Sequence, residues 1–206
     1  MVDCTRVGML ETVQKTTDLS ARERFVAVAA ELFARNGYDG TSIRDIAREM
    51  GVTPGAVYAH FVSKAGLLLA VYKTGVERIS SAVDEEIHAS TDPWTNLERA
   101  CWRHLEVLVA ENGFAKVVIR VLPTDIEEVA GELTTLRRQY EERFRRLIDA
   151  LELRAGTNRN LLRLQLLGAL NWTQVWYRAE HADLADIAHA LVENLRRGTE
   201  IQDGDA

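Results

Sequence analysis

Four side chains within residues 53–64 carry groups that suit contacts with phosphate oxygens. Thr53, Tyr58 and His60 offer hydroxyl or ring N–H donors, and Lys64 adds a cation. Such donors, together with backbone amides at helix N-termini, hold the phosphates of nucleic acids. The pattern therefore points to DNA binding.

The rest of the sequence offers little for catalysis. The spacing suggests no Ser-His-Asp arrangement, no glycine-rich phosphate loop follows a strand pattern, and the five histidines form no metal-ligand cluster. Cys101 lies on an apolar stripe, where a thiol is usually an inert core group. We therefore expect no enzyme activity, no catalytic residue, no metal and no cofactor.

The charge distribution argues weakly against nucleic-acid binding. The net charge is −6 and the pI is near 5.5, whereas many nucleic-acid-binding domains are strongly basic. Residues 20–64 contain six basic and five acidic groups, for +1, and residues 65–206 contain 17 and 23, for −6. DNA contact must therefore depend on a few well-placed groups.

The length of 206 residues and the apolar fraction of 47% are those of an ordinary soluble protein with a full core. No apolar run reaches the ~18 residues of a membrane span, and charged residues interrupt any signal-peptide pattern at the N-terminus. Cys4 and Cys101 suggest no disulfide framework. We expect a cytoplasmic protein without membrane contact.

Helical periodicity runs through almost the whole chain, and no credible strand is found. Two short helices at 41–51 and 53–61 flank a tight turn at Gly51-Val52, which is typical of a helix-turn-helix whose second helix enters the major groove. The predicted fold is all-α, with nine helices. We expect four segments: a loose arm (1–19), a three-helix DNA-binding domain (20–66), a helical ligand-binding and dimerisation domain (67–200) and a tail (201–206).

Four segments resemble, in order and spacing, the N-terminal domain of the TetR family of transcription regulators, over residues 21–72. They are Phe33-Ala34-Arg35-Asn36-Gly37-Tyr38, Thr41-Ser42-Ile43-Arg44-Asp45-Ile46-Ala47, Gly51-Val52 and Tyr58-Ala59-His60-Phe61-Val62-Ser63-Lys64.

The resemblance implies roles for individual residues. Gly66 departs from the family pattern, where an acidic or other helix-forming residue is expected, and we expect it to soften the start of the following helix. Carried over position by position, the family implies DNA-facing roles for Thr41, Ser42, Arg44, Thr53, Gly55, Ala56, Tyr58, His60 and Lys64.

The resemblance also implies that the last two long helices pair with those of a second subunit. Apolar stripes on 158–178 and 182–197 agree with a homodimer, which would place two recognition helices on a palindromic operator. The alternative is that these stripes face the core of one subunit. The expected interface residues are Leu164, Gly168, Leu184, Ile187, Leu191 and Leu195.

Trp172 and Trp176 are spaced i, i+4 on one helix face beside Asn171, a combination typical of an apolar ligand pocket. This stretch resembles that of TetR-type regulators that respond to acyl-CoA thioesters. Alternatively, the tryptophans belong to the core or the interface, and the polar side chains face solvent. The expected ligand-binding residues are His104, Arg120, Tyr140, Asn171, Trp172 and Trp176.

The sequence thus predicts a repressor that a small apolar ligand, such as an acyl-CoA of lipid or steroid catabolism, releases from operator DNA. The alternative is a TetR-like regulator that a protein partner controls without any small ligand. A sizeable internal cavity favours the ligand, whereas a packed domain favours the partner.

Overall fold

Serine caps begin the first two helices of the computed structural model. The hydroxyl of Ser20 accepts a hydrogen bond from the Glu23 amide (3.3 Å), and the Glu23 carboxylate accepts one from the Ser20 amide (2.8 Å). Ser42 and Asp45 form the same reciprocal pair, at 3.2 and 3.0 Å. Each pair satisfies amides that a helix start leaves without partners, which fixes where these two helices begin.

The structure describes residues 20–87, 90–110 and 113–199. Within these ranges it contains nine α-helices, two short 3₁₀ helices and no strand, which confirms the all-α prediction. The predicted arm and tail lie outside the described residues. The elements are α2 (Ala21–Asn36), α3 (Ile43–Glu49), α4 (Pro54–Tyr58), α5 (Lys64–Asp84), α6 (Pro93–Val109), α7 (Gly113–Arg120), η1 (Pro123–Asp125), η2 (Glu127–Val129), α8 (Ala130–Asp149), α9 (Arg159–Trp176) and α10 (Leu184–Thr199).

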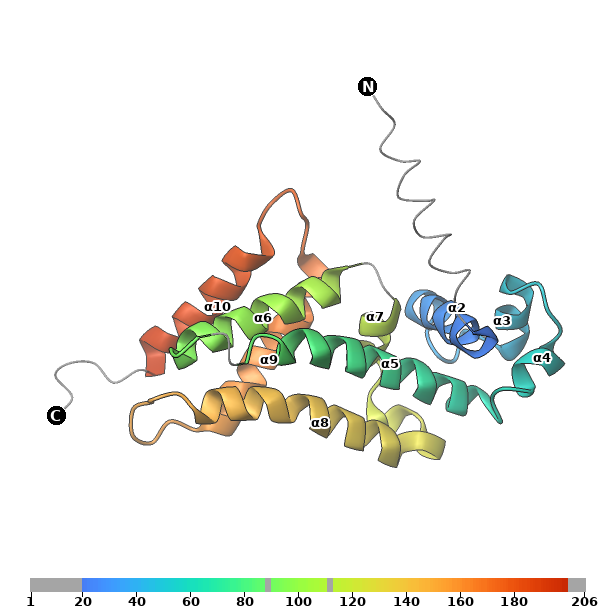
Figure 1. The fold of residues 1–206 in the computed structure, drawn as a ribbon, viewed down its shortest axis with the longest axis horizontal. Helices are drawn as coiled ribbons and strands as arrows, with labels where there is room; N and C mark the ends of the chain where they lie inside the picture. Colours follow the sequence, from blue (N-terminus) through green and yellow to red (C-terminus); the bar gives the residue numbers. More distant parts are fainter. Residues whose placement is uncertain (1–19, 88–89, 111–112, 200–206) are drawn as a thin grey trace, which may run out of the picture.

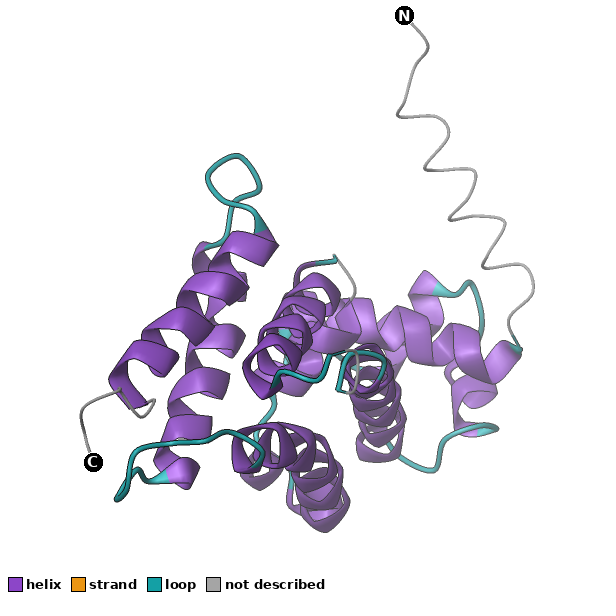
Figure 2. Ribbon diagram, turned by 60° about the vertical axis from the view of Figure 1, so that its left-hand side comes forward, coloured by secondary structure: helices purple, strands orange, loops and turns teal. Residues whose placement is uncertain are grey.

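The helices form an elongated molecule with α2, α3 and α4 at one end (Figure 1). Helix α5 starts beside α4 and runs into the remaining helices, where α6 and α8 flank it. Helices α9 and α10 lie at the far end, and the turned view shows them side by side (Figure 2). A small N-terminal domain is thus joined to a larger helical domain through α5.

Helix α7 provides a second connection between the two parts of the molecule, because it packs against both α2 and α5. The contact is close: a Cβ atom at Gly113 would lie 2.4 Å from the Ala30 carbonyl oxygen, and one at Gly75 would lie 2.9 Å from the Phe114 carbonyl oxygen. The Gly113 amide also donates to Glu31 of α2 (2.8 Å). Glycine at these positions lets α7 touch its neighbours through their backbones.

Helix α5 is the centre of the hydrophobic core. Eleven of its residues are buried, among them Leu67, Leu68, Val71 and Ile79, because helices pack on it from several sides. The predicted weakness at Gly66 is offset locally, since its amide donates to the Ser63 hydroxyl at 3.0 Å and caps the helix. No helix in the described ranges combines the length and the hydrophobicity that a membrane span requires.

Candidate nucleic-acid interface and ligand cavity

The short helix α4 presents its polar residues outward. Gly51 adopts a φ of +67°, which makes the tight turn after α3, and Pro54 occupies the first helical turn, where a missing N–H has no cost. Val57 is fully buried and fixes the helix to the domain. Tyr58 is 54% exposed and His60 is exposed beside Phe25.

A groove of about 650 Å³ joins α4 to the start of α3 and α5. It brings together five of the predicted DNA-facing residues: Thr41, Ser42, Arg44, Tyr58 and Lys64. Thr53 and Gly55 are exposed on α4, and Ala56 is half-buried. The sequence did not single out Val62, which follows α4 and is 97% exposed.

Thr41 was expected to face DNA, but its side chain is 1% exposed. Its hydroxyl donates to the carbonyl oxygens of Leu32 (3.2 Å) and Gly37 (2.9 Å) and so closes the end of α2. The prediction of a side-chain contact with DNA is therefore wrong for Thr41. A hydroxyl that satisfies buried carbonyl groups has a structural role.

Lys64 contributes to the fold as well as to the groove. Its ammonium donates to the carbonyl oxygens of Tyr38 (2.9 Å) and Thr41 (3.1 Å) and lies 4.0 Å from the centre of the Tyr38 ring. Because an ammonium has three N–H donors, one is left over for a phosphate.

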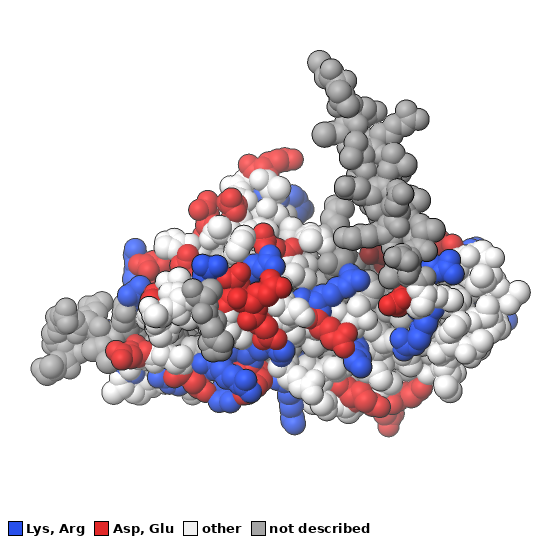
Figure 3. Space-filling view, in the orientation of Figure 1, with Lys and Arg blue, Asp and Glu red and all other residues white. Residues whose placement is uncertain are grey.

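The surface charge of the helix-turn-helix end agrees with the near-neutral sequence count. In the view of Figure 3 this end is mainly uncharged with scattered basic groups, whereas the larger domain carries mixed acidic and basic side chains. Asp39 also lines the groove. Contact with DNA therefore depends on individual donors.

A second hollow, of about 200 Å³, lies in the larger domain between α5, α7, α8 and α9 and reaches the surface at the exposed Leu164 and Gly168. Apolar side chains form most of its wall, with polar groups at a few points. The lining residues are Tyr72, Val76, Val118, Ile119, Arg137, Tyr140, Glu141, Leu164, Leu167, Gly168 and Asn171.

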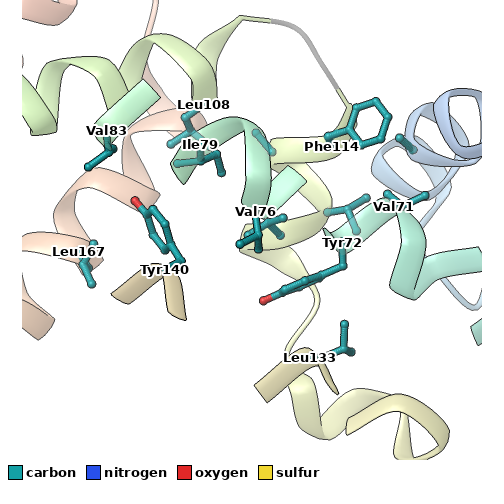
Figure 4. Close-up of a cluster of buried hydrophobic side chains, with 14 of the residues drawn as sticks. Val71, Tyr72, Val76, Ile79, Val83, Leu108, Phe114, Leu133, Tyr140 and Leu167 are labelled. Carbon is teal, nitrogen blue, oxygen red and sulfur yellow. The ribbon is translucent and has the colours of Figure 1, made fainter. Parts of the chain in front are cut away.

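Tyr72 carries the most unusual group of this cavity. Its side chain is fully buried, yet its hydroxyl has no hydrogen-bond partner among the described residues. In the view of Figure 4 the hydroxyl points toward the side on which Tyr140 and Leu167 lie. Burial raises the pKa of Tyr72, so this hydroxyl keeps its proton and remains a donor. A buried hydroxyl without a partner is costly, which points to a missing acceptor.

A buried polar pair lies behind the cavity wall. His104 Nδ1 and the Tyr140 hydroxyl are hydrogen-bonded, and both side chains are buried. Burial lowers the pKa of His104 to about 4, and the nearby Asn171 acts weakly in the opposite direction. The side-chain amide oxygen of Asn171 and His104 Nε2 nevertheless lack partners in the part of the chain that the structure describes. His104 is therefore neutral at pH 7.

Charged side chains lie at the edge of the cavity. Glu141 pairs with Arg137 (3.3 Å) and with Arg163 of α9 (2.6 Å). Two guanidinium groups thus share one carboxylate, which leaves a local charge of +1.

Some predicted ligand residues lie elsewhere. Tyr140 and Asn171 line the cavity, and His104 lies behind it. Trp172 and Trp176 are 64% and 49% exposed on the outer face of α9, so their prediction as pocket residues is wrong. Arg120 also lies outside this cavity: it is exposed, donates to the Ala34 carbonyl oxygen of α2 (3.2 Å) and lines a separate hollow of about 240 Å³ between α2 and α7.

The two apolar stripes of the last helices face different ways. On α10, Ile187 is buried, and Leu184, Leu191 and Leu195 pack partly buried against the core of the same chain. Within the single chain this seam packs against α6, as the alternative interpretation expects, and the contact of its partly buried leucines with a partner subunit stays a prediction. On α9, exposed apolar residues and one exposed glycine follow one another every three or four positions. They are Leu161, Leu164, Gly168, Trp172 and Val175, and the exposed Trp176 lies four positions after Trp172.

A further hollow, of about 760 Å³, lies between α5, α6 and α8. Its charged groups already have partners: Arg143 pairs with Asp84 (2.7 Å), and Arg146 with Glu142 (3.1 Å). None of the buried polar atoms that lack a partner among the described residues belongs to its lining, whereas two of them, on Tyr72 and Asn171, belong to the cavity beside Tyr72.

Two features together define a DNA-binding regulator. They are a helix-turn-helix with an exposed second helix and, joined to it, a helical domain that contains a cavity. Two family models match the chain: "Bacterial regulatory proteins, tetR family" over residues 25–71 and "Tetracyclin repressor-like, C-terminal domain" over residues 90–199. The chain therefore belongs to the TetR family of transcriptional regulators, which are not enzymes. Members of this family bind operator DNA and act as dimers.

Relatives with known names support this assignment. The chain is 22% identical to the fatty acid metabolism regulator protein of Bacillus subtilis, over 85% of this chain and 93% of the relative. Two solved complexes share the fold. AibR with isovaleryl coenzyme A and operator DNA has a TM-score of 0.76 and 18% identity, with 85% and 97% of the two chains covered. FadR from Bacillus subtilis with stearoyl-CoA has a TM-score of 0.70 and 21% identity, with 84% and 96% covered.

Proposed function

We propose that this protein is a repressor that binds a palindromic operator as a homodimer and releases it when an acyl-CoA-type ligand enters the cavity beside Tyr72. The observation that carries the proposal is the buried, unpartnered Tyr72 hydroxyl in a largely apolar cavity. Such a cavity favours a small ligand over control by a protein partner. The acyl-CoA ligands named for two proteins of the same fold support the ligand class.

Helices α5 and α7 give the cavity a route to the DNA-binding domain. Tyr72 and Val76 of α5 and Val118 of α7 line the cavity. The start of α5 adjoins α4, and α7 touches α2 at Gly113. A ligand that pushes α5 and α7 apart would tilt the DNA-binding domain and change the spacing of two recognition helices. The ligand releases DNA only if it binds this tilted conformation more tightly than the conformation that binds DNA.

The homodimer is proposed to form through the exposed stripe of α9. Leu161, Leu164 and Trp172 lie on the surface of the single chain, where they would be poorly solvated. The exposed Gly168 has no atom within 4 Å of the position that a Cβ would take, so a second helix can approach closely there.

Titration of the protein–operator complex with acyl-CoAs of several lengths tests the ligand part. The operator is first isolated from a random DNA library. A coupling free energy of about 1–3 kcal/mol would lower operator affinity roughly 5- to 150-fold at saturation. If no acyl-CoA changes operator affinity, ligand control by this class is refuted, whereas DNA binding through α4 is not.

A further inference from the structure

We infer that the cavity holds a short acyl group, of about four to seven carbons, whose carbonyl oxygen accepts a hydrogen bond from Tyr72. This inference rests on the proposed function and narrows its ligand. It depends on three features: the size of the cavity, the donor at its wall and the charge at its edge.

The size of the cavity sets the length of the acyl group. A cavity of roughly 150 Å³ holds benzene, with its six carbons. The 200 Å³ found here therefore corresponds to about eight non-hydrogen atoms. An 18-carbon chain exceeds this space more than twofold. In this conformation there is no further space between α5 and α7 at Gly75, where an added Cβ would lie 2.9 Å from the Phe114 carbonyl oxygen, so a longer chain would have to separate these helices.

The polar groups define what the ligand must carry. Tyr72 offers a buried donor beside the apolar side chains of Val76, Val118 and Leu167. An acyl carbonyl supplies an acceptor and an apolar tail, which matches a donor beside apolar side chains. The ligand thereby removes the cost of the unpaired hydroxyl, so Tyr72 selects an acyl group over a hydrocarbon of equal size.

The charge at the edge favours an anionic continuation of the ligand. Arg137 lines the cavity. The two positive charges of Arg137 and Arg163 outnumber the single negative charge of Glu141, with which both pair. The phosphates of a coenzyme A thioester and the carboxylate of a free acid share this negative charge. The two sources of the acyl group are distinguished by experiment.

Calorimetric titration of the full-length protein with butanoyl-, hexanoyl- and octadecanoyl-CoA, and with hexanoate, tests the inference. We expect the short thioesters to bind more tightly than octadecanoyl-CoA. Tyr72→Phe should weaken hexanoyl-CoA roughly 2- to 12-fold, the loss expected for one neutral hydrogen bond. Tyr177→Phe, at the end of α9 and outside the cavity lining, should leave affinity unchanged. Equal binding of hexanoate would support the inference and identify the free acid as the source.

Enlargement of the cavity gives an independent test. Val118→Ala removes two methyl groups from the wall and should move the preferred acyl length upward by about two carbons. Strongest binding of octadecanoyl-CoA to the unmodified protein would overturn the inference and leave the proposed function standing. An unchanged affinity in Tyr72→Phe would also overturn it. Absence of binding by every acyl-CoA would refute the proposed ligand class itself.

Discussion

Replacement of Gly113 by alanine should weaken the contact between α7 and the DNA-binding domain. An added Cβ would lie 2.4 Å from the Ala30 carbonyl oxygen, 2.5 Å from the Ala30 carbonyl carbon and 2.7 Å from the Glu31 amide nitrogen. All three atoms belong to the backbone and cannot rotate away. Helix α7 must therefore move by about 1 Å from α2 to restore an ordinary contact of 3.4 Å.

The cost follows from this displacement. Overpacking in a tight interior typically destabilises a protein by about 1–3 kcal/mol. For a chain of this size each kcal/mol lowers the melting temperature by about 2–4 °C, so Gly113→Ala should lower it by about 2–12 °C. The shift also strains the hydrogen bond from the Gly113 amide to Glu31.

Thermal unfolding at fixed protein concentration is the assay, with Gly131→Ala as the matched control. Nothing lies within 4 Å of a Cβ at Gly131, an exposed position in the first turn of α8. Alanine there should be neutral or stabilise by up to about 1 kcal/mol. If Gly113→Ala melts at the same temperature as Gly131→Ala, the close contact between α7 and α2 is refuted.

Three further predictions concern separate parts of the molecule. Because the pKa of His104 is about 4 in the folded protein and ~6.5 in an unfolded chain, the free energy of unfolding should fall as the pH drops from about 6.5 to 4. His104→Gln should flatten that part of a urea-unfolding pH series, and an unchanged slope would contradict the assignment. Trp172→Arg should produce monomers in sedimentation, whereas Leu191→Arg should instead lower the melting temperature, because Leu191 packs against the core of its own chain. Lys64→Met should lower both stability and affinity for DNA of any sequence, with a shallower salt dependence; unchanged affinity would remove Lys64 from the DNA contact.

The helices and the helix-turn-helix could be predicted because their signals are local. A serine followed three residues later by an acidic residue marks a helix start, as at Ser20 and Ser42, and Gly51 marks the turn. These features depend on neighbouring residues, so the sequence contains all the information that they need.

The candidate sites were harder to predict because they depend on contacts between distant elements. Helical spacing shows that Trp172 and Trp176 share a face, but it does not say whether that face meets solvent, core or partner. Helical spacing likewise does not show that the stripe of Ile187 packs against α6 of its own chain. Thr41 is buried because carbonyl groups at the end of α2 need a donor. Tyr72 resembled an ordinary core residue, although a tyrosine in a buried stripe needs a partner for its hydroxyl.

Selection of bound sequences from a random DNA library tests the central claim most directly. A dimer with two α4 helices should enrich a palindrome whose half-sites are about one helical turn apart. Tyr58→Ala with His60→Ala, both on exposed positions, should abolish the enrichment without lowering the melting temperature greatly. Enrichment of no sequence by the unmodified protein, or an identical palindrome selected by the double variant, would contradict DNA recognition through α4.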